Sequence, residues 1–320
     1  MEKQYKVGII GAGNIAARFD EPGSKDVLTH AHAYSLHPGF KICGFADVDE
    51  EKARVAASQW GGRVYQTVDE LLSREQPEII SVCTPDETHA EVVKQLKGKN
   101  ILGGILEKPL AVDFADARAI TVSPLVKKGK FVVNYSRLFV PEFQKLRQDY
   151  RQVAYGRLVS VTGYYGKGLI HNGSHMISLF HWLFGNVKVV KKLSTVYDYT
   201  KTDPNVSAIL QLPDKVMCFL CAVDSRLYTM FELDMFFEKA RVRMVESGHK
   251  LEVYELERSK RYSGYTTMSP KEVITTSLGR SLAFAVENLY NWLEGKQPPL
   301  STVGEAFAVQ RICQDIILAK

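Results

Sequence analysis

Residues 7–16 read VGIIGAGNIA, a short apolar run that leads directly into the pattern GxGxxA. The apolar run predicts a buried strand, and the glycine pattern predicts a tight turn into a helix. Gly11 permits the turn, Gly13 lets the backbone approach a pyrophosphate, and Ala16 is small enough for helix and strand to pack. We therefore predict that the phosphates of a dinucleotide lie over the start of this helix; the alternative is an ordinary glycine turn. The contact residues expected from the pattern are Gly11, Gly13, Asn14 and Ile15.

Further short apolar runs follow along the first part of the chain. They lie at residues 41–46, 78–83, 101–106 and 130–134, and amphipathic segments separate most of them. Strands that alternate with helices are typical of βαβ units, whose parallel sheet is covered on both faces. Since such crossovers are right-handed, we expect a doubly wound Rossmann domain over residues 1–136.

The pattern changes after about residue 137. A helix is expected at residues 141–152, another at 174–184, and two more at 281–294 and 302–318. The strand-like runs between them lie at residues 158–165, 187–197, 206–212, 216–223, 229–237, 240–246 and 251–256. Several are joined by short segments with Pro, Asp or Gly, which is a hairpin signal. The chain is thus predicted to be an α/β protein whose second domain, residues 137–320, contains a large, mostly antiparallel open sheet.

The composition excludes several classes of protein. Among 320 residues, 41 are Lys or Arg and 36 are Asp or Glu, so the net charge is +5. This excess is too small to indicate nucleic acid as a partner, although it suits a small anionic ligand. Five scattered cysteines are expected as buried thiols in a reducing cytoplasm, and Cys218-x-x-Cys221 is expected to be core. No targeting signal is expected, and the longest apolar run, residues 216–223, is too short to cross a membrane.

The second apolar run ends at Asp47, which is placed to accept hydrogen bonds from an adenosine ribose. Its distance from the glycines exceeds the usual ~20 residues, and a polar loop at 19–34 is expected to account for the excess. A carboxylate repels a 2′-phosphate, which favours NAD over NADP. The alternative is that Asp47 lies at the surface and caps the helix at 49–59.

Two more runs end at the same predicted sheet edge. Thr84 and Pro85 are expected to border the dinucleotide, whereas His89 could contact the cofactor or simply cap and pack its helix. The next run ends in Glu107-Lys108-Pro109, and the proline constrains the direction of Lys108. Beside a nicotinamide its ammonium could bind a substrate hydroxyl or polarise a carbonyl. From the residues alone, a solvated lysine in a turn is the better interpretation.

A dense polar cluster, HNGSH at residues 171–175, precedes an apolar helix. Ser174 is expected to be the N-cap, which places His175 at the start of the helix. Imidazole titrates near neutral pH, so His175 suits the proton transfer that accompanies hydride transfer. A packing role for His175 is one alternative. Zinc bound by His171 and His175 is the other, but no glutamate lies between them and no metal is expected.

Taken in order, these motifs resemble the Gfo/Idh/MocA oxidoreductases. The set consists of GxGxxA, Asp47, VCTP at 82–85 with His89, EKP at 107–109, NYSR at 134–137 and GSH at 173–175. The resemblance covers nearly the whole chain. It implies a Rossmann domain, a second α/β domain whose open sheet is used in oligomerisation, and NAD(P)-dependent oxidation or reduction of a sugar, cyclitol or related hydroxyl compound.

The resemblance also implies roles for particular residues. The family's EKP lysine, here Lys108, is catalytic or substrate-orienting, and the histidine of its DxxxH pattern, here His175, acts as acid and base. The family aspartate falls at His171, and Asn172 is expected to take part of its orienting role. Glu107 is expected near the cofactor. The residues expected to bind substrate are Arg137, Tyr165, His171 and Asn172, and Arg137 suits a carboxylate, phosphate or nucleotide on the sugar.

The expected protein is therefore a cytoplasmic sugar or cyclitol dehydrogenase that uses NAD rather than NADP. It is expected to form a homodimer or homotetramer through the second domain's sheet, with no nucleic-acid or membrane partner. Two alternatives remain. One is a catalytically inactive NAD(H)-binding regulatory protein, supported only by His171 in place of the aspartate. The other is an NAD-retaining sugar lyase or glycosidase of the same family.

Overall fold

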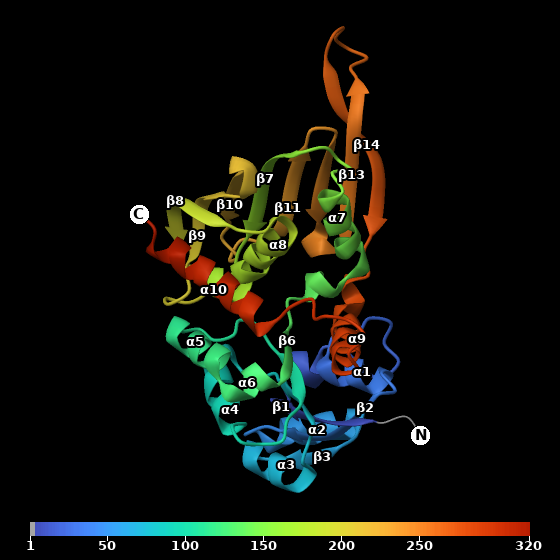
Figure 1. The fold of residues 1–320 in the computed structure, drawn as a ribbon, viewed down its shortest axis with the longest axis vertical. Helices are drawn as coiled ribbons and strands as arrows, with labels where there is room; N and C mark the ends of the chain where they lie inside the picture. Colours follow the sequence, from blue (N-terminus) through green and yellow to red (C-terminus); the bar gives the residue numbers. More distant parts are fainter. Residues whose placement is uncertain (1–3) are drawn as a thin grey trace. The chain divides into compact units, whose positions relative to one another are not determined.

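The computed structural model describes residues 4–320, which form two compact units (Figure 1). The first unit runs to Phe139 and also contains Gly279–Ala308. The second contains Val140–Leu278 and Val309–Lys320. Each unit is built around one sheet, and the predicted α/β class, with a parallel and a mostly antiparallel sheet, is confirmed.

The first unit contains a six-stranded sheet in the order β3-β2-β1-β4-β5-β6, with every pair parallel. Its strands are β1 (Tyr5–Ile10), β2 (Phe40–Ala46), β3 (Arg63–Tyr65), β4 (Ile79–Val82), β5 (Gly103–Leu106) and β6 (Lys130–Val133). The order reverses between β1 and β4, and in such sheets ligands bind outside the carboxyl ends at this point. Short, half-exposed β3 carries too little apolar pattern to have been predicted.

Helices cover this sheet. They are α1 (His30–Leu36), α2 (Glu50–Trp60), α3 (Val68–Glu75), α4 (His89–Gln95), α5 (Phe114–Val122), α6 (Pro124–Lys128) and α9 (Ser281–Leu293). The segment after the glycines is a single π-helical turn, Asn14–Arg18, and is shorter than the predicted helix. The polar loop ends at Thr29, earlier than predicted, because the Thr29 side chain accepts a hydrogen bond from the N–H of His32 and so caps α1.

Helix α9 belongs to the first unit, although the sequence analysis assigned it to the second domain. Its apolar face, with Leu282, Val286 and Leu289 all buried, is part of the core that also contains β1 and α1. Near its end, the Lys130 ammonium at the start of β6 donates to the carbonyl of Trp292 at 2.6 Å. Helical periodicity correctly predicted α9, but periodicity does not say which core an apolar face joins.

The second unit contains an eight-stranded sheet in the order β14-β13-β12-β11-β7-β10-β9-β8. Its strands are β7 (Leu158–Tyr165), β8 (Lys188–Val196), β9 (Asn205–Gln211), β10 (Met217–Ala222), β11 (Phe231–Phe237), β12 (Ala240–Val245), β13 (Lys250–Arg258) and β14 (Thr266–Thr275). All pairs are antiparallel except β7 with β10. The predicted strands agree with seven of these within about two residues. Polar β14, which contains Pro270, was missed; it is an edge strand, where proline is tolerated.

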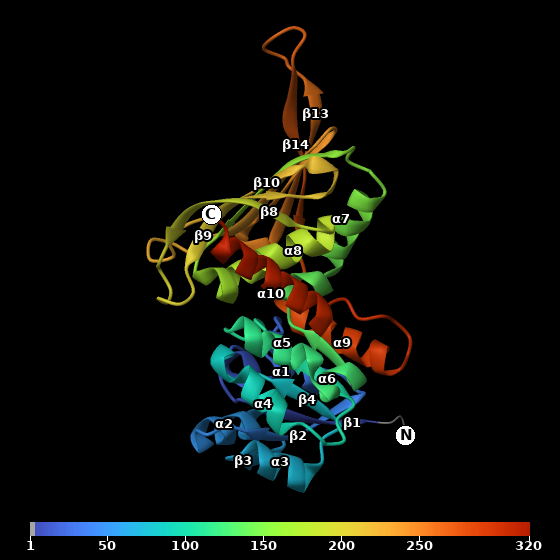
Figure 2. The ribbon, with the colours of Figure 1, turned by 60° about the vertical axis from the view of Figure 1, so that its left-hand side comes forward.

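Helices lie against one face of this sheet, as Figure 1 and Figure 2 show for α7 (Pro141–Arg151) and α8 (Ser174–Phe184). Met176 and Phe180 of α8 pack against Gly163 in β7. Helix α10 (Val303–Leu318) ends in this unit, where the Lys192 ammonium donates to the carbonyl of Ile317 at 2.9 Å.

The opposite face of the sheet carries charged and aromatic side chains. The guanidinium of Arg241 in β12 donates to Asp234 in β11 at 2.9 Å, and Arg243 donates to Glu252 in β13 at 3.0 Å. The Arg241 guanidinium also lies 4.8 Å from the ring centre of Phe236. Alternate residues of each strand therefore separate an apolar, helix-covered face from a paired, polar one.

Leu289→Ala tests the placement of α9. Removing this fully buried side chain should destabilise the protein by about 2–5 kcal/mol. Hydrogen exchange should show reduced protection of β1 and β2 with little change in β11 and β12. Leu318→Ala, at a largely exposed position, is the control and should change neither. Equal loss of protection in both sheets would contradict the assignment of α9 to the first core.

Candidate functional site

The glycine turn after β1 has the conformation that a phosphate-binding turn requires. Gly11 has φ +87°, and a Cβ there would lie 2.7 Å from the backbone carbonyl of Cys83. Gly13 has φ −75°, and a Cβ there would meet no atom within 4 Å. The first glycine is therefore required by the fold, whereas the second leaves open space above the chain, where a ligand can approach.

Asp47 lies against the same turn. One carboxylate oxygen accepts the N–H of Ala12 at 2.7 Å, and the other accepts the N–H of Asp49 at 2.9 Å. Asp47 does not cap α2; Asp49 does, by accepting the N–H of Lys52. The alternative interpretation of Asp47 as a helix cap is therefore wrong. Its carboxylate stands beside the glycines, as ribose recognition requires.

The loop after β4 contains Thr84, Pro85 and, one helical turn later, His89. The Thr84 hydroxyl is buried and has no hydrogen-bond partner among residues 4–320. His89 is buried, and its ring nitrogens lie 2.8 Å from the carbonyl oxygen of Pro109 and 3.0 Å from that of Thr84. Its polar atoms therefore face protein backbone, while Pro85 is exposed at the loop surface.

Glu107 follows β5 and points into the unit. Its Oε1 lies 2.8 Å from Nε2 of His30 and accepts the Nδ2 hydrogen of Asn134 at 2.6 Å. Burial raises the pKa of Glu107, but the hydrogen bonds from His30 and Asn134 and the charge of Lys108 together hold it below its ordinary value. The carboxylate is therefore ionised at neutral pH and lies next to Lys108, which is half-buried.

This edge of the sheet fits a dinucleotide. Gly13, with the open space beside it, follows β1, and Asp47 follows the adjacent strand β2. The buried Thr84 hydroxyl and the buried Oδ1 of Asn134 both lack hydrogen-bond partners within the described part of the chain. Buried polar atoms are costly unless bonded, so these two atoms point to a ligand with hydrogen-bonding groups. The adjoining N–H groups of Asn14 and Ile15 begin the π-helical turn that follows the glycines.

The histidine cluster of the second unit lies in and after another π-helical turn, Gly168–Gly173. Asp203, 32 residues further along the chain, accepts the N–H groups of Ile170 and His171 at 2.8 Å each. Burial raises the pKa of Asp203. The turn continues directly into α8, because Gly173 is itself helical, so Ser174 is not the predicted N-cap. Its hydroxyl is buried with no partner among the described residues.

The turn and α8 bring three predicted residues together, all half-buried. The His171 ring stacks on Tyr199 with 4.7 Å between ring centres, and His175 meets Phe231 edge-on at 6.3 Å. Asn172 donates to the carbonyl of Gly166 at 2.8 Å. His175 is thus presented by a turn that Asp203 supports, rather than by a conventional helix start.

Two other predicted residues lie differently. Tyr165 is fully buried, and its hydroxyl accepts the N–H of Val206 at 2.7 Å and donates to the Val206 carbonyl at 3.0 Å. It therefore stabilises β9, and its hydroxyl is not directed to a ligand. Arg137 follows β6 in a 3₁₀ turn of the first unit. Burial lowers the pKa of Arg137 to about 10, because the charged guanidinium is removed from water.

Sequence reasoning missed three polar residues: His30, Asn134 as a donor to Glu107, and Asp203. His30 lay inside the segment read as a loop, and only its position just after Thr29, a residue type favoured at N-caps, could have indicated a helix there. Asn134 was part of the NYSR motif at 134–137, but no role was predicted for it. Asp203 precedes Pro204, and this dipeptide predicts only a turn, with no indication of a partner elsewhere in the chain.

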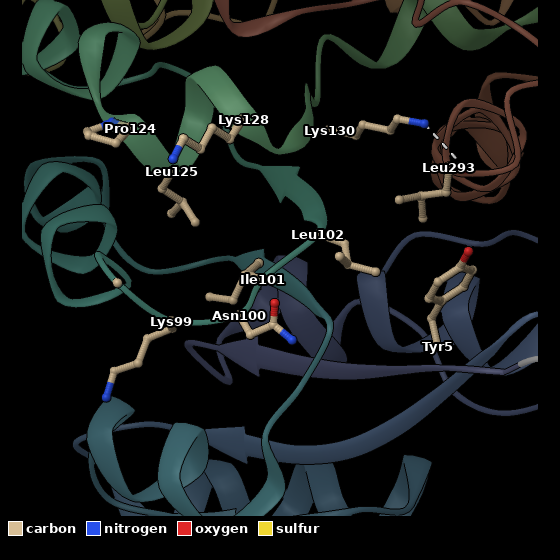
Figure 3. Close-up of a pocket in the computed structure, with 11 residues that line it drawn as sticks. Tyr5, Lys99, Asn100, Ile101, Leu102, Pro124, Leu125, Lys128, Lys130 and Leu293 are labelled. Carbon is tan, nitrogen blue, oxygen red and sulfur yellow. Dashed lines mark hydrogen bonds between the residues drawn. The ribbon is translucent and has the colours of Figure 1, made fainter.

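A separate pocket of about 560 Å³ lies at the amino ends of the first sheet (Figure 3). Tyr5, Leu102 and Lys130, which begin or precede strands, line it, and Lys130 donates to the carbonyl of Leu293 at 3.2 Å. It lies at the opposite edge from the glycine turn, so it is not the dinucleotide site. No group of three metal-ligating side chains occurs among residues 4–320, and none of their helices could span a membrane.

Comparison with known proteins gives a consistent result. Residues 5–135 match the model of the Gfo/Idh/MocA family, described as an oxidoreductase family with an NAD-binding Rossmann fold. The chain is 28% identical over 176 residues to an inositol 2-dehydrogenase of Rubrobacter xylanophilus. The aligned region covers 53% of this chain and 46% of that protein. It is 24% identical over 226 residues to the rhizopine catabolism protein MocA of Rhizobium meliloti, covering 65% and 67%. A glucose-6-phosphate 3-dehydrogenase of Bacillus subtilis is 30% identical over 135 residues, covering 42% and 35%.

Solved structures agree over nearly the whole chain. A 3-ketoreductase from Actinomadura kijaniata in complex with NADP matches with a TM-score of 0.77 at 15% identity, covering 99% of this chain and 98% of that one. An oxidoreductase from Agrobacterium radiobacter in complex with NAD+, L-tartaric acid and magnesium matches with 0.76 at 14% identity, covering 98% and 96%. These identities show a shared fold. Residues 5–135, which match the family model, are a Rossmann domain of the Gfo/Idh/MocA type, and the chain spans about half the length of the inositol dehydrogenase it matches.

Proposed function

We propose that the protein is an NAD-dependent dehydrogenase that transfers a hydride between nicotinamide and a hydroxyl or keto carbon of a sugar, sugar derivative or cyclitol. The observation that carries the proposal is the ionised, hydrogen-bonded Glu107 next to Lys108, at the carboxyl edge of a sheet that also bears the glycine turn. The names of the relatives, an inositol 2-dehydrogenase and a glucose-6-phosphate 3-dehydrogenase, support this substrate class.

The proposed mechanism divides the work among few side chains. A bound nicotinamide supplies the hydride acceptor or donor. The Lys108 ammonium binds the substrate oxygen and stabilises the negative charge that develops on it. His175 takes the hydroxyl proton in oxidation and returns it in reduction. The carboxylate expected at position 171 is absent, but Asp203 places a carboxylate on the backbone of the same turn. Arg137 is the proposed partner for an anionic group on the substrate, and His171 and Asn172 are also proposed to bind substrate.

The first test is a panel of cyclitols, sugar acids, phosphorylated sugars and nucleotide sugars with NAD, read as NADH absorbance. Lys108→Ala and His175→Ala should each lower kcat by about 10²–10⁴-fold, because each removes charge or proton transfer at the reacting carbon. Both variants should still bind NADH by fluorescence. Lys99→Ala, at a partly exposed surface lysine that pairs with Asp69, is the control and should keep full activity. Dehydrogenase activity that survives in the Lys108→Ala/His175→Ala double variant would refute these roles.

The same panel separates the two alternatives. A regulatory protein, which His171 in place of the family aspartate favours, would bind NADH tightly and turn over nothing. A lyase or glycosidase would retain NAD through purification and convert substrate with no net NADH.

We infer a preference for NAD over NADP, since the Asp47 carboxylate is fixed by the N–H of Ala12. Asp47→Asn keeps an acceptor oxygen for that N–H but removes the charge that repels a 2′-phosphate. The ratio of kcat/KM for NAD to that for NADP should fall by about tenfold or more, which corresponds to ~1.4 kcal/mol. Glu51→Gln, at an exposed acid in the neighbouring helix α2, should leave the ratio unchanged. An unchanged ratio in Asp47→Asn would remove Asp47 from cofactor discrimination.

We further infer a homodimer or homotetramer formed through the polar face of the eight-stranded sheet, in the reducing cytoplasm that five unpaired cysteines favour. This face carries Tyr164, Phe236, Tyr254, Arg241 and Arg243, and aromatic residues and arginine are enriched at protein interfaces. Phe236→Asp should shift the oligomer toward monomer in sedimentation velocity. Val55→Asp, at an exposed site in α2, should not. A monomeric wild-type protein at micromolar concentration would contradict the inference.

A further inference from the structure

Two buried histidines bind the residues on either side of Lys108. We propose that His30 and His89 are positioning residues for Lys108, His30 by fixing the Glu107 carboxylate and His89 by fixing the Pro109 carbonyl. The inference rests on the proposed role of Lys108, and it gives His89 a task other than the cofactor contact or the helix capping and packing considered from its sequence position.

The His30 end is a chain of buried polar groups. His30 is fully buried, and its Nε2 lies 2.8 Å from Glu107 Oε1. Since a carboxylate can only accept, this nitrogen carries a hydrogen. The other ring nitrogen lies 3.0 Å from the Ser81 hydroxyl, which is in turn hydrogen-bonded to the Tyr34 hydroxyl at 3.0 Å. Both ring nitrogens are therefore held, and the ring fixes the carboxylate in one place.

The strength of this anchor follows from burial. Glu107 is 7% exposed, and a buried carboxylate that loses a partner is strongly destabilised. Its Oε1 has a second donor, Asn134 Nδ2, at 2.6 Å. Moving Glu107 away from His30 would break a charge-assisted bond inside the unit, so the residue before Lys108 has one favourable position.

The His89 end joins two loops. His89 is 2% exposed, and its Nδ1 lies 2.8 Å from the Pro109 oxygen while its Nε2 lies 3.0 Å from the Thr84 oxygen. Carbonyl oxygens can only accept, so each of these bonds is donated by the ring nitrogen that makes it. The ring thereby links the loop after β4 to the loop after β5, immediately after Lys108.

Lys108 therefore lies between two residues that are each bonded to a buried imidazole. Its backbone position is set by side chains that do not touch the reacting atoms. Because a misplacement of about 1 Å can cost ~10²-fold in rate, loss of either anchor should lower kcat more than it raises KM.

The test exploits which ring nitrogen makes each bond. A glutamine amide reaches the position of Nε2, whereas an asparagine amide reaches that of Nδ1. At position 30, His30→Gln keeps the donor to Glu107 and His30→Asn loses it. At position 89, His89→Asn keeps the donor to Pro109 and His89→Gln loses it. We expect kcat within threefold of wild type for His30→Gln and His89→Asn, and at least a tenfold loss for His30→Asn and His89→Gln.

A second readout needs no substrate. The protein is treated with an amine-specific reagent, and the extent of Lys108 modification over time is quantified by mass spectrometry. The rate of Lys108 modification should rise several-fold in His30→Asn and His89→Gln only. His37→Asn and His37→Gln form the matched control, because this histidine bonds Glu287 in the same unit. Both should behave as wild type. Absence of turnover in the wild-type protein would refute the proposed function, while the labelling still decides the positioning role.

Equal kcat and labelling for asparagine and glutamine at both positions would overturn the proposal, since a packing role does not distinguish the two ring nitrogens. Melting curves identify any variant that does not fold. If a position-30 variant does not fold, Asn134→Ala takes its place, because it removes the other bond to Glu107 without altering either histidine. It should also raise Lys108 labelling, and unchanged labelling would contradict the proposal.

Discussion

The buried carboxylate of Glu107 is the constraint on which the first unit's site depends. An unpaired carboxylate in this position would cost several kcal/mol, so the fold must deliver its partners accurately. They come from three places: His30 from the first turn of α1, Asn134 from the end of β6, and Ser81, through His30, from β4. A charge at the carboxyl edge of one strand thus requires the correct placement of elements more than twenty residues away on either side of it.

The sequence predicted this architecture well wherever a simple periodicity was present. The apolar runs gave five strands of the first sheet, and hairpin-type connections gave seven strands of the second with small shifts at the ends. The prediction was incomplete where an element has no such periodicity, or where the periodicity does not specify what the element packs against. β3 has three residues, and β14 is polar and contains Pro270, so neither shows an apolar signature. The amphipathic pattern of α9 is clear, but the surface it covers is decided by tertiary packing.

For the candidate site, too, some residues could be predicted from the sequence and others could not. Gly11 and Asp47 could be predicted to lie close together because both are tied to a local motif, and the structure places Asp47 against Ala12, the residue after Gly11. Tyr165 shows the opposite case, because alternation along a strand says that a side chain faces inward but not that its hydroxyl bonds a neighbouring strand. Asp203 and His30 act through contacts over many residues of sequence separation, which no short motif records.

The bond between Asp47 and the N–H of Ala12 also bears on how such proteins diverge. One carboxylate braces the glycine turn and, in the proposed function, also carries the negative charge at the ribose position, so that proposal links local rigidity to cofactor choice. A descendant that moved to the phosphorylated dinucleotide by replacing this acid with a residue that offers no acceptor oxygen would loosen its own phosphate-binding turn at the same step. Adding a basic side chain beyond the turn, at exposed Val48 for example, would retain the brace and is the less costly evolutionary route.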